Sequence, residues 1–128
     1  MRLLLDTHSF LWFIDDSPRL STAARHLIED TGNEICLSMA SVWEIAIKIS
    51  AGKLDLGRPI ETRIPQELRD NNMNLLSITL DHAAAVAVLP LHHRDPFDRM
   101  LVALSRVEQM PLVSSDVALD AYGVTRLW

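Results

Sequence analysis

Four acidic residues stand apart along the chain, at positions where a sheet-based fold would bring their side chains together. Asp6 closes an apolar run near the N-terminus, and Asp116 follows another near the C-terminus. Glu44 and Asp98 lie in the first turns of stretches with helical periodicity. Carboxylates that converge repel one another unless a cation neutralises them, and Mg²⁺ or Mn²⁺ prefers such oxygen ligands. A cation held in this way suits the hydrolysis of phosphodiester bonds.

Short apolar runs alternate with amphipathic stretches along the chain. This pattern is typical of an α/β fold with a mostly parallel, five-stranded sheet flanked by helices. We predict strands over residues 2–5, 35–39, 74–78, 111–114 and 124–128. In open parallel sheets, ligands bind beyond the carboxyl ends of the strands. Asp6 and Asp116 follow two of those ends, so a site is expected at that edge.

The helices are indicated by capping residues and by apolar periodicity. We predict helices that begin after Ser21, at residue 42, after Thr79 and after Asp95. Asp95 is a predicted N-cap because Pro96 suits the first helical position, and this helix should reach about residue 109. A further stretch over residues 60–68 has helical spacing, and Pro65 predicts its division into two short helices.

Each of the four acids also has a structural interpretation. Glu44 completes a Ser41-x-x-Glu44 capping box. Asp98, at the third helical position, complements the helix dipole, and Asp116 caps a short helix that follows it. Asp6 lacks such an explanation, since a carboxylate that closes a wholly apolar strand gains nothing structurally. Singly these signals are weak, and it is their joint placement that indicates a site.

Composition limits the classes of protein that fit. The 128 residues suit one domain over 1–128, and a hydrophobic content of 48% allows a packed core. A net charge of −5 argues against a broad basic surface for nucleic acid, although bound cations reverse the sign locally. The single cysteine, Cys36, excludes an internal disulfide. Every apolar stretch is well short of the roughly 20 residues of a membrane span, so we expect a cytoplasmic protein without membrane contact.

Four stretches around the acids resemble the PIN-domain nucleases, and in particular the VapC-type toxins of bacterial toxin–antitoxin pairs. They are residues 3–12 (LLLDTHSFLW), 38–48 (SMASVWEIAIK), 92–103 (HHRDPFDRMLVA) and 112–116 (LVSSD). Their order and spacing run through the whole chain. The family's fourth motif often carries threonine where this chain has Ser114, which exchanges one hydroxyl for another.

The resemblance implies a single PIN-like domain with Asp6, Glu44, Asp98 and Asp116 around one or two Mg²⁺ ions, for which Mn²⁺ is the expected substitute. It selects Asp98 over Asp95, because the family's third acid precedes the apolar helical stretch. It also implies a cytoplasmic endoribonuclease that leaves 5′-phosphate and 3′-hydroxyl ends. As the toxin of a type II toxin–antitoxin pair, such a protein would form a homodimer and be inhibited by a cognate antitoxin protein.

Other polar side chains near the motifs have two interpretations each. Arg94 and Arg99 are candidate RNA-binding residues or solvated surface charges. Lys48 follows the second acid by four residues, which predicts an ordinary ion pair on a helix face. His92 and His93 suggest zinc, but the other ligands of a closed zinc site are missing.

Aromatic residues gather near the first two acidic motifs. They are Phe10, Trp12, Phe13 and Trp43, and we expect them to pack in the core. A groove for a partner helix or a second subunit is the next interpretation, and stacking on single-stranded RNA is the third.

A phosphatase, a receiver domain and a non-catalytic PIN module are the alternative classes. A phosphatase of the haloacid dehalogenase type requires a second Asp two residues after Asp6, where His8 stands. A receiver domain requires a lysine late in the chain, and none follows Lys53. The remaining alternative is a non-catalytic PIN module that acts only through protein binding. The complete acidic set favours the enzyme.

Overall fold

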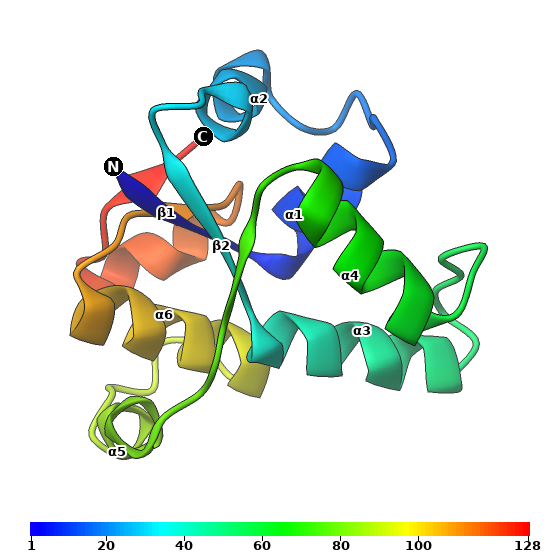
Figure 1. Ribbon diagram of the computed structural model, residues 1–128. Coiled ribbons are helices and arrows are strands. Elements are labelled where there is room, and N and C mark those ends of the chain that lie inside the picture. The colour runs from blue at the N-terminus through cyan, green and yellow to red at the C-terminus, as the bar shows by residue number, and fades with distance from the viewer.

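The computed structural model describes residues 1–128, and its centre is a five-stranded sheet in the order β3-β2-β1-β4-β5 (Figure 1). The strands are β1 (Arg2–Leu5), β2 (Glu34–Ser38), β3 (Asn74–Leu76), β4 (Leu112–Val113) and β5 (Arg126–Leu127), and every neighbouring pair is parallel. The helices are α1 (Thr7–Ile14), α2 (Thr22–Glu29), α3 (Met39–Ser50), α4 (Ile60–Asp70), α5 (Leu80–Ala87), α6 (Pro96–Glu108) and the 3₁₀ helix η1 (Val117–Tyr122). None of the helices combines the length and apolar character needed to span a membrane. The predicted α/β fold with a parallel sheet is confirmed.

The central strand β1 is buried on both faces, as expected for a parallel strand that helices cover from each side. Leu3 and Leu5 pack in one core with Phe10 of α1, whereas Leu4 packs in the other with Leu101 of α6. Figure 1 shows α5 and α6 side by side on one side of β1 and β2, and α1 and α4 on the other. These buried leucines fix the end of β1, from which Asp6 emerges.

Most predicted elements are present with slightly different ends. The five strands lie where they were expected, with β3, β4 and β5 shorter than predicted. Ser21 caps α2 through the backbone N–H of Ala24, at 3.0 Å. Thr79 caps α5, and Asp95 caps α6 with Pro96 in its first turn, so these three predicted helix starts are confirmed.

The sequence pattern does not predict α1, because residues 9–14 are almost wholly apolar and lack a helical period. The helix begins directly after β1, where Oδ1 of Asp6 accepts a hydrogen bond from the backbone N–H of Ser9 at 2.8 Å. Asp6 is therefore an N-cap, and the expectation that it has no structural role is wrong.

Two further helix predictions are wrong. Helix α3 begins at Met39 and not at residue 42, because Ser38 at the end of β2 is its N-cap. Ser41 therefore lies inside the helix, and the capping-box interpretation of Glu44 fails. Helix α4 continues through Pro65 without a break. Burial of Ile64 in the core holds that helix together where the proline removes a backbone donor.

Candidate metal-dependent active site

The four predicted acids reach the carboxyl edge of the sheet from four different elements. Asp6 follows β1 directly, and Glu44 lies in the second turn of α3, which follows β2 without a loop. Asp116 comes soon after β4, and Asp98 lies in the first turn of α6. Because β1, β2 and β4 are adjacent and parallel, their carboxyl ends meet at one edge.

The pKa of Asp98 reflects this convergence. Burial raises the pKa of the Asp98 carboxyl to about 7, and the charges of Asp95, Asp6 and Glu44 raise it as well, while His93 lowers it. The Asp98 side chain is 24% exposed, so it is both shielded and open to a small ligand. A carboxyl group with so high a pKa is shielded from water first of all, and it also lies near other negative charges.

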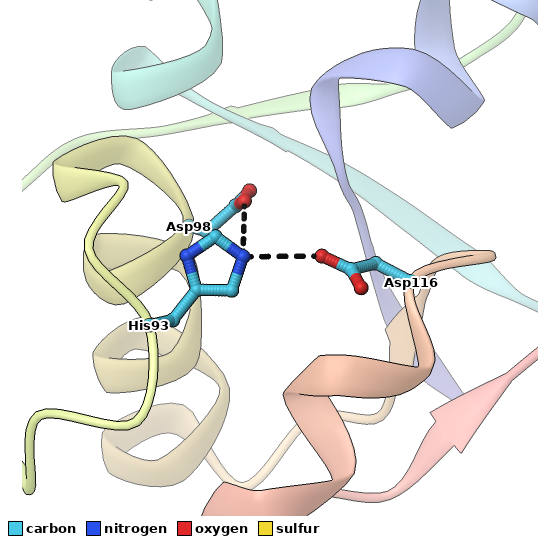
Figure 2. A group of neighbouring side chains, drawn as sticks. All are labelled: His93, Asp98 and Asp116. Atoms are coloured by element: carbon cyan, nitrogen blue, oxygen red, sulfur yellow. Dashed lines mark hydrogen bonds and ion pairs between the residues drawn. The ribbon is translucent and has the colours of Figure 1, made fainter.

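His93 lies between two of the acids (Figure 2). Its Nε2 is 3.3 Å from Oδ2 of Asp98 and 3.2 Å from Oδ2 of Asp116. Its Nδ1 accepts a hydrogen bond from the backbone N–H of Asp95 at 3.1 Å. A neutral ring therefore carries its proton on Nε2 and donates it to the carboxylates. In this orientation His93 is a hydrogen-bond partner of the acids and not a metal ligand.

Asp6 and Asp116 divide their two carboxylate oxygens between two tasks. Oδ1 of Asp6 caps α1, and Oδ1 of Asp116 accepts from the backbone N–H of Ala118 at 3.0 Å to cap η1. Oδ2 of Asp116 points toward His93 (Figure 2). The predicted cap at Asp116 is confirmed, and in both residues the cap fixes one oxygen while the other stays available to a ligand.

Both carboxylate oxygens of Glu44 have polar partners within the chain. It is 7% exposed, and its Oε1 lies 2.6 Å from Oγ1 of Thr7. Oγ1 of Thr7 is also 2.9 Å from Oγ of Ser41, and its single proton goes to the carboxylate, the stronger acceptor. Nζ of Lys48 lies 2.9 Å from Oε2, which is the predicted ion pair. Because both of its oxygens are engaged, Glu44 is better suited to supply a fixed negative charge near the ion than to coordinate the ion directly.

The donor set of this edge fits a hard divalent cation. Oδ2 of Asp98 and Oδ2 of Asp116 already converge on a single hydrogen-bond donor, and Asp6 lies within electrostatic range of Asp98. Carboxylate oxygens are the ligands that Mg²⁺ and Mn²⁺ prefer, and a cation among them removes the repulsion that raises the pKa of Asp98. Asp98 and Asp116 are the residues best placed to hold such an ion.

Comparison with known proteins identifies the family of this chain. The profile of the PIN domain matches residues 3–124. This chain belongs to the PIN-domain family. It is 34% identical to Ribonuclease VapC16 of Mycobacterium tuberculosis (strain ATCC 25618 / H37Rv) over 89 residues, which span 60% of this chain and 63% of that protein, slightly under two thirds. It is 29% identical to Ribonuclease VapC22 of the same organism over 121 residues, 94% of this chain and 91% of that protein.

Solved structures share the PIN-domain fold. VapBC2 from Rickettsia felis, bound to a DNA fragment from its promoter, matches with a TM-score of 0.75 at 13% identity, covering 100% of this chain and 99% of that one. A toxin–antitoxin complex from Klebsiella pneumoniae matches with a TM-score of 0.68 at 16% identity, covering 98% and 96%. The family resemblance drawn from the four motifs is thereby confirmed.

The two predicted RNA-binding arginines of this PIN domain differ in their surroundings. Arg94 is exposed on the loop before α6. The guanidinium of Arg99 instead donates to the carbonyl oxygens of Val86, in the last turn of α5, and of Leu89 and Pro90 just after it, at 3.4, 3.3 and 2.9 Å. Arg99 thus closes the C-terminal end of that helix, and only Arg94 is free to meet a substrate.

Sequence reasoning considered His93 only for zinc and missed its place among the acids. The available signal was its position two residues before the predicted N-cap Asp95, which keeps it beside the first turn of α6. Tyr122 was missed as well. Its hydroxyl accepts hydrogen bonds from the backbone N–H groups of His92 and His93, at 3.2 and 2.9 Å, and so holds the loop that presents His93.

Proposed function

We propose that this chain is a metal-dependent endoribonuclease that hydrolyses RNA phosphodiester bonds, and that it is the toxin of a type II toxin–antitoxin pair. The observation that carries the proposal is the convergence of Asp98 and Asp116 on one point, beside buried Asp6 and Glu44. The ribonuclease names of the relatives VapC16 and VapC22 support the same reaction class.

The side chains of the site have separable roles in this reaction. Asp98 and Asp116 hold the ion, Asp6 adds a third carboxylate, and Glu44 keeps negative charge beside them. When bound, Mg²⁺ or Mn²⁺ supplies Lewis acidity toward the scissile phosphate. Asp116 is the most exposed of the acids and is our assignment for the base that takes a proton from the attacking water.

The bond changes follow from in-line hydrolysis. The oxygen of water forms a bond to phosphorus, and the bond from phosphorus to the 3′ oxygen breaks. The proton removed from water goes to the Asp116 carboxylate, and the leaving 3′ oxygen takes up a proton from solvent water. The products are a 5′-phosphate and a 3′-hydroxyl, as the family resemblance implies.

We also propose that this chain binds partners of the kind found in the similar structures. The similar structures are a VapBC2 assembly and a toxin–antitoxin complex, which supports an antitoxin protein as a partner of this chain. A homodimer and a cytoplasmic location belong to the same proposal. Sedimentation of the purified chain, alone and with the product of a neighbouring short reading frame, tests both assemblies.

Cleavage of a mixed RNA pool by the purified chain tests the proposed reaction. We expect cleavage with Mg²⁺ or Mn²⁺ and none with EDTA. Asp6→Asn should abolish it, whereas Asp70→Asn, an exposed acid at the end of α4, should cleave as the wild type does. A wild-type chain that neither binds Mn²⁺ near neutral pH nor cleaves RNA would contradict the proposal and favour the non-catalytic PIN module.

A further inference from the structure

A groove of about 370 Å³ adjoins the acidic site and has no assigned role. Ile47 and Lys48 of α3 line one wall, and the stretch from Arg94 to Phe97, which includes Asp95, lines the other. Glu44 belongs both to this groove and to the acidic cluster, so a chain that lies in the groove is continuous with the site.

The charges of the groove are unusual for this protein. The whole chain carries a net charge of −5, yet this groove is lined by as many cations, Lys48 and Arg94, as acids, Glu44 and Asp95, and Asp95 is engaged as the N-cap of α6. Arg94 is exposed and takes part in none of the ion pairs of the chain. Lys48 is one-third exposed and is held toward the site by Glu44. Two cations beside a carboxylate-held ion are complementary to the phosphates of one nucleic-acid strand.

An aromatic pair, exposed Trp43 and partly buried Phe97, lies beside these cations. Trp43 is 61% exposed although it neighbours Glu44 in sequence, and its ring meets the edge of Phe97 with centroids 5.3 Å apart. Ile47, one turn later on α3, is also exposed. The expectation that Trp43 packs in the core is therefore wrong. Phe97 fixes the indole on one side and leaves the rest of its surface open, which is the arrangement on which an unpaired base stacks.

We propose that this groove binds the nucleotide next to the scissile phosphate of single-stranded RNA, with Lys48 and Arg94 at its phosphate and its base against Trp43. The inference rests on the proposed ribonuclease activity and deepens it, since it assigns a substrate subsite. A protein occupant, either a second copy or an antitoxin, would use the apolar side chains but would not require two cations beside the acids. The unpaired, exposed Arg94 and the exposed indole of Trp43, both beside the acids, therefore favour RNA.

Anisotropy of a fluorescein-labelled oligouridylate, measured in EDTA to prevent cleavage, tests this subsite. Trp43→Ala should weaken binding about tenfold, as expected for the loss of one stacked base, and Trp43→Phe should weaken it less. Arg94→Ala should weaken binding and lower the slope of log affinity against log salt by about 0.7, the value for one phosphate contact on a single strand. Arg106→Ala is the matched control, because Arg106 is exposed like Arg94 but lies farther along, on α6, and outside the groove.

Intrinsic fluorescence supplies a second readout that does not depend on affinity. The oligouridylate should quench the wild type and Trp12→Phe to a similar extent, because Trp12 packs against Trp128 and lies outside the groove. The quenching should be lost in Trp43→Phe. Quenching that persists in Trp43→Phe would overturn the assignment of this residue.

The remaining outcomes separate this inference from the activity on which it rests. Wild-type oligouridylate affinity in both Trp43→Ala and Arg94→Ala overturns the subsite, even when the chain cleaves RNA. Dissociation of a dimer or loss of antitoxin binding in Trp43→Ala, with unchanged oligouridylate affinity, also overturns it and assigns the face to protein contact. A wild type that binds oligouridylate through Trp43 but never cleaves RNA supports the subsite and defeats the proposed activity alone.

Discussion

Acidic side chains differ in burial and in ion pairing between the two edges of the sheet. At the amino ends of the strands, Glu34 and Glu108 face Arg2, with N–O distances of 3.8 and 3.9 Å in a solvent-exposed setting. At the carboxyl ends, Asp6 and Asp98 are largely buried, and neither forms an ion pair with lysine or arginine. At the first edge both acids are paired with an arginine, whereas at the second only Glu44 has a basic partner of this kind, Lys48, and Asp6 and Asp98 have none.

This difference separates acids that serve solubility from acids that serve a ligand. Helix α6 carries one of each, with Asp98 in its first turn and Glu108 at its end. An exposed pair such as that of Glu108 contributes little to folding. A buried carboxyl with a raised pKa destabilises the folded chain when ionised, and such clusters are typical of functional sites. The carboxyl edge is therefore where a divalent cation has most to contribute.

Removing one acid from each edge is the strongest test of this difference between the edges. Asp98→Asn should lower Mg²⁺-dependent RNA cleavage by about a thousandfold or more, because it removes an ion ligand without changing side-chain size. Glu34→Gln should cleave as the wild type does. Gel assays of a labelled RNA at matched protein concentrations measure both, and equal loss in the two variants would remove the distinction between the edges.

The second prediction concerns stability against pH. The pKa of Asp98 is about 7 in the folded chain against an ordinary value of 3.8, so between these values the folded chain holds a proton that the unfolded chain has released. Without metal, the free energy of unfolding should therefore fall as pH rises from about 4 to 7, by on the order of 2–4 kcal/mol relative to Asp98→Asn. Urea titrations of both proteins across this range measure the difference.

Added Mn²⁺ tests the same acidic site through the stability that ion binding adds. At pH 8 it should raise the melting temperature of the wild type and leave that of Asp98→Asn nearly unchanged, because ion binding stabilises only a folded site. Equal shifts in both proteins would place the bound ion elsewhere.

The acids at the carboxyl edge also show how far the sequence could predict the site. The positions of all four residues follow from the strand pattern and the family motifs. A structural interpretation was set against the functional one for Asp116 and none was found for Asp6, yet each residue caps a helix with Oδ1 and leaves Oδ2 for the site or for solvent. A sequence pattern assigns a residue and not its two oxygens, so this division could not be predicted.

Two other errors have local physical causes. The serines at positions 38 and 41 both suit an N-cap, and only the end of β2 decides that Ser38 is the cap and that Glu44 lies deeper in α3. His93 was missed because its role depends on the path of the loop before α6, which Tyr122 holds from a distant part of the chain. Contacts of this kind leave no periodic signal in the sequence.

A smaller effect is expected from the hydrogen bond that holds Glu44. Thr7→Val removes the hydroxyl 2.6 Å from Oε1 and should cost about 1.5–3 kcal/mol of folding free energy, the range for a bond to a charged group. Cleavage should fall about ten- to a hundredfold, as for the loss of a residue that orients a site carboxylate. Thr7→Ser keeps the hydroxyl and should restore most of both. If Thr7→Ser is as impaired as Thr7→Val, the methyl group and not the hydrogen bond carries the effect.

The smallest effect is expected at the amino edge. Arg2→Gln breaks both exposed pairs with Glu34 and Glu108 and should change the free energy of unfolding by no more than about 1 kcal/mol, with unchanged cleavage. Urea denaturation and the same RNA assay measure the two quantities. A large loss of stability in this variant would mean that the amino edge carries structural charge of its own.

The most direct test of the carboxyl-edge site is the anomalous scattering of a crystal soaked in Mn²⁺. We predict a peak within coordination distance, about 2.0–2.3 Å, of the Asp98 and Asp116 carboxylates, with Asp6 and Glu44 beside it. The peak should be absent from crystals of Asp98→Asn. A strong peak elsewhere on the chain, or none at this edge of the wild type at saturating Mn²⁺, would contradict the account.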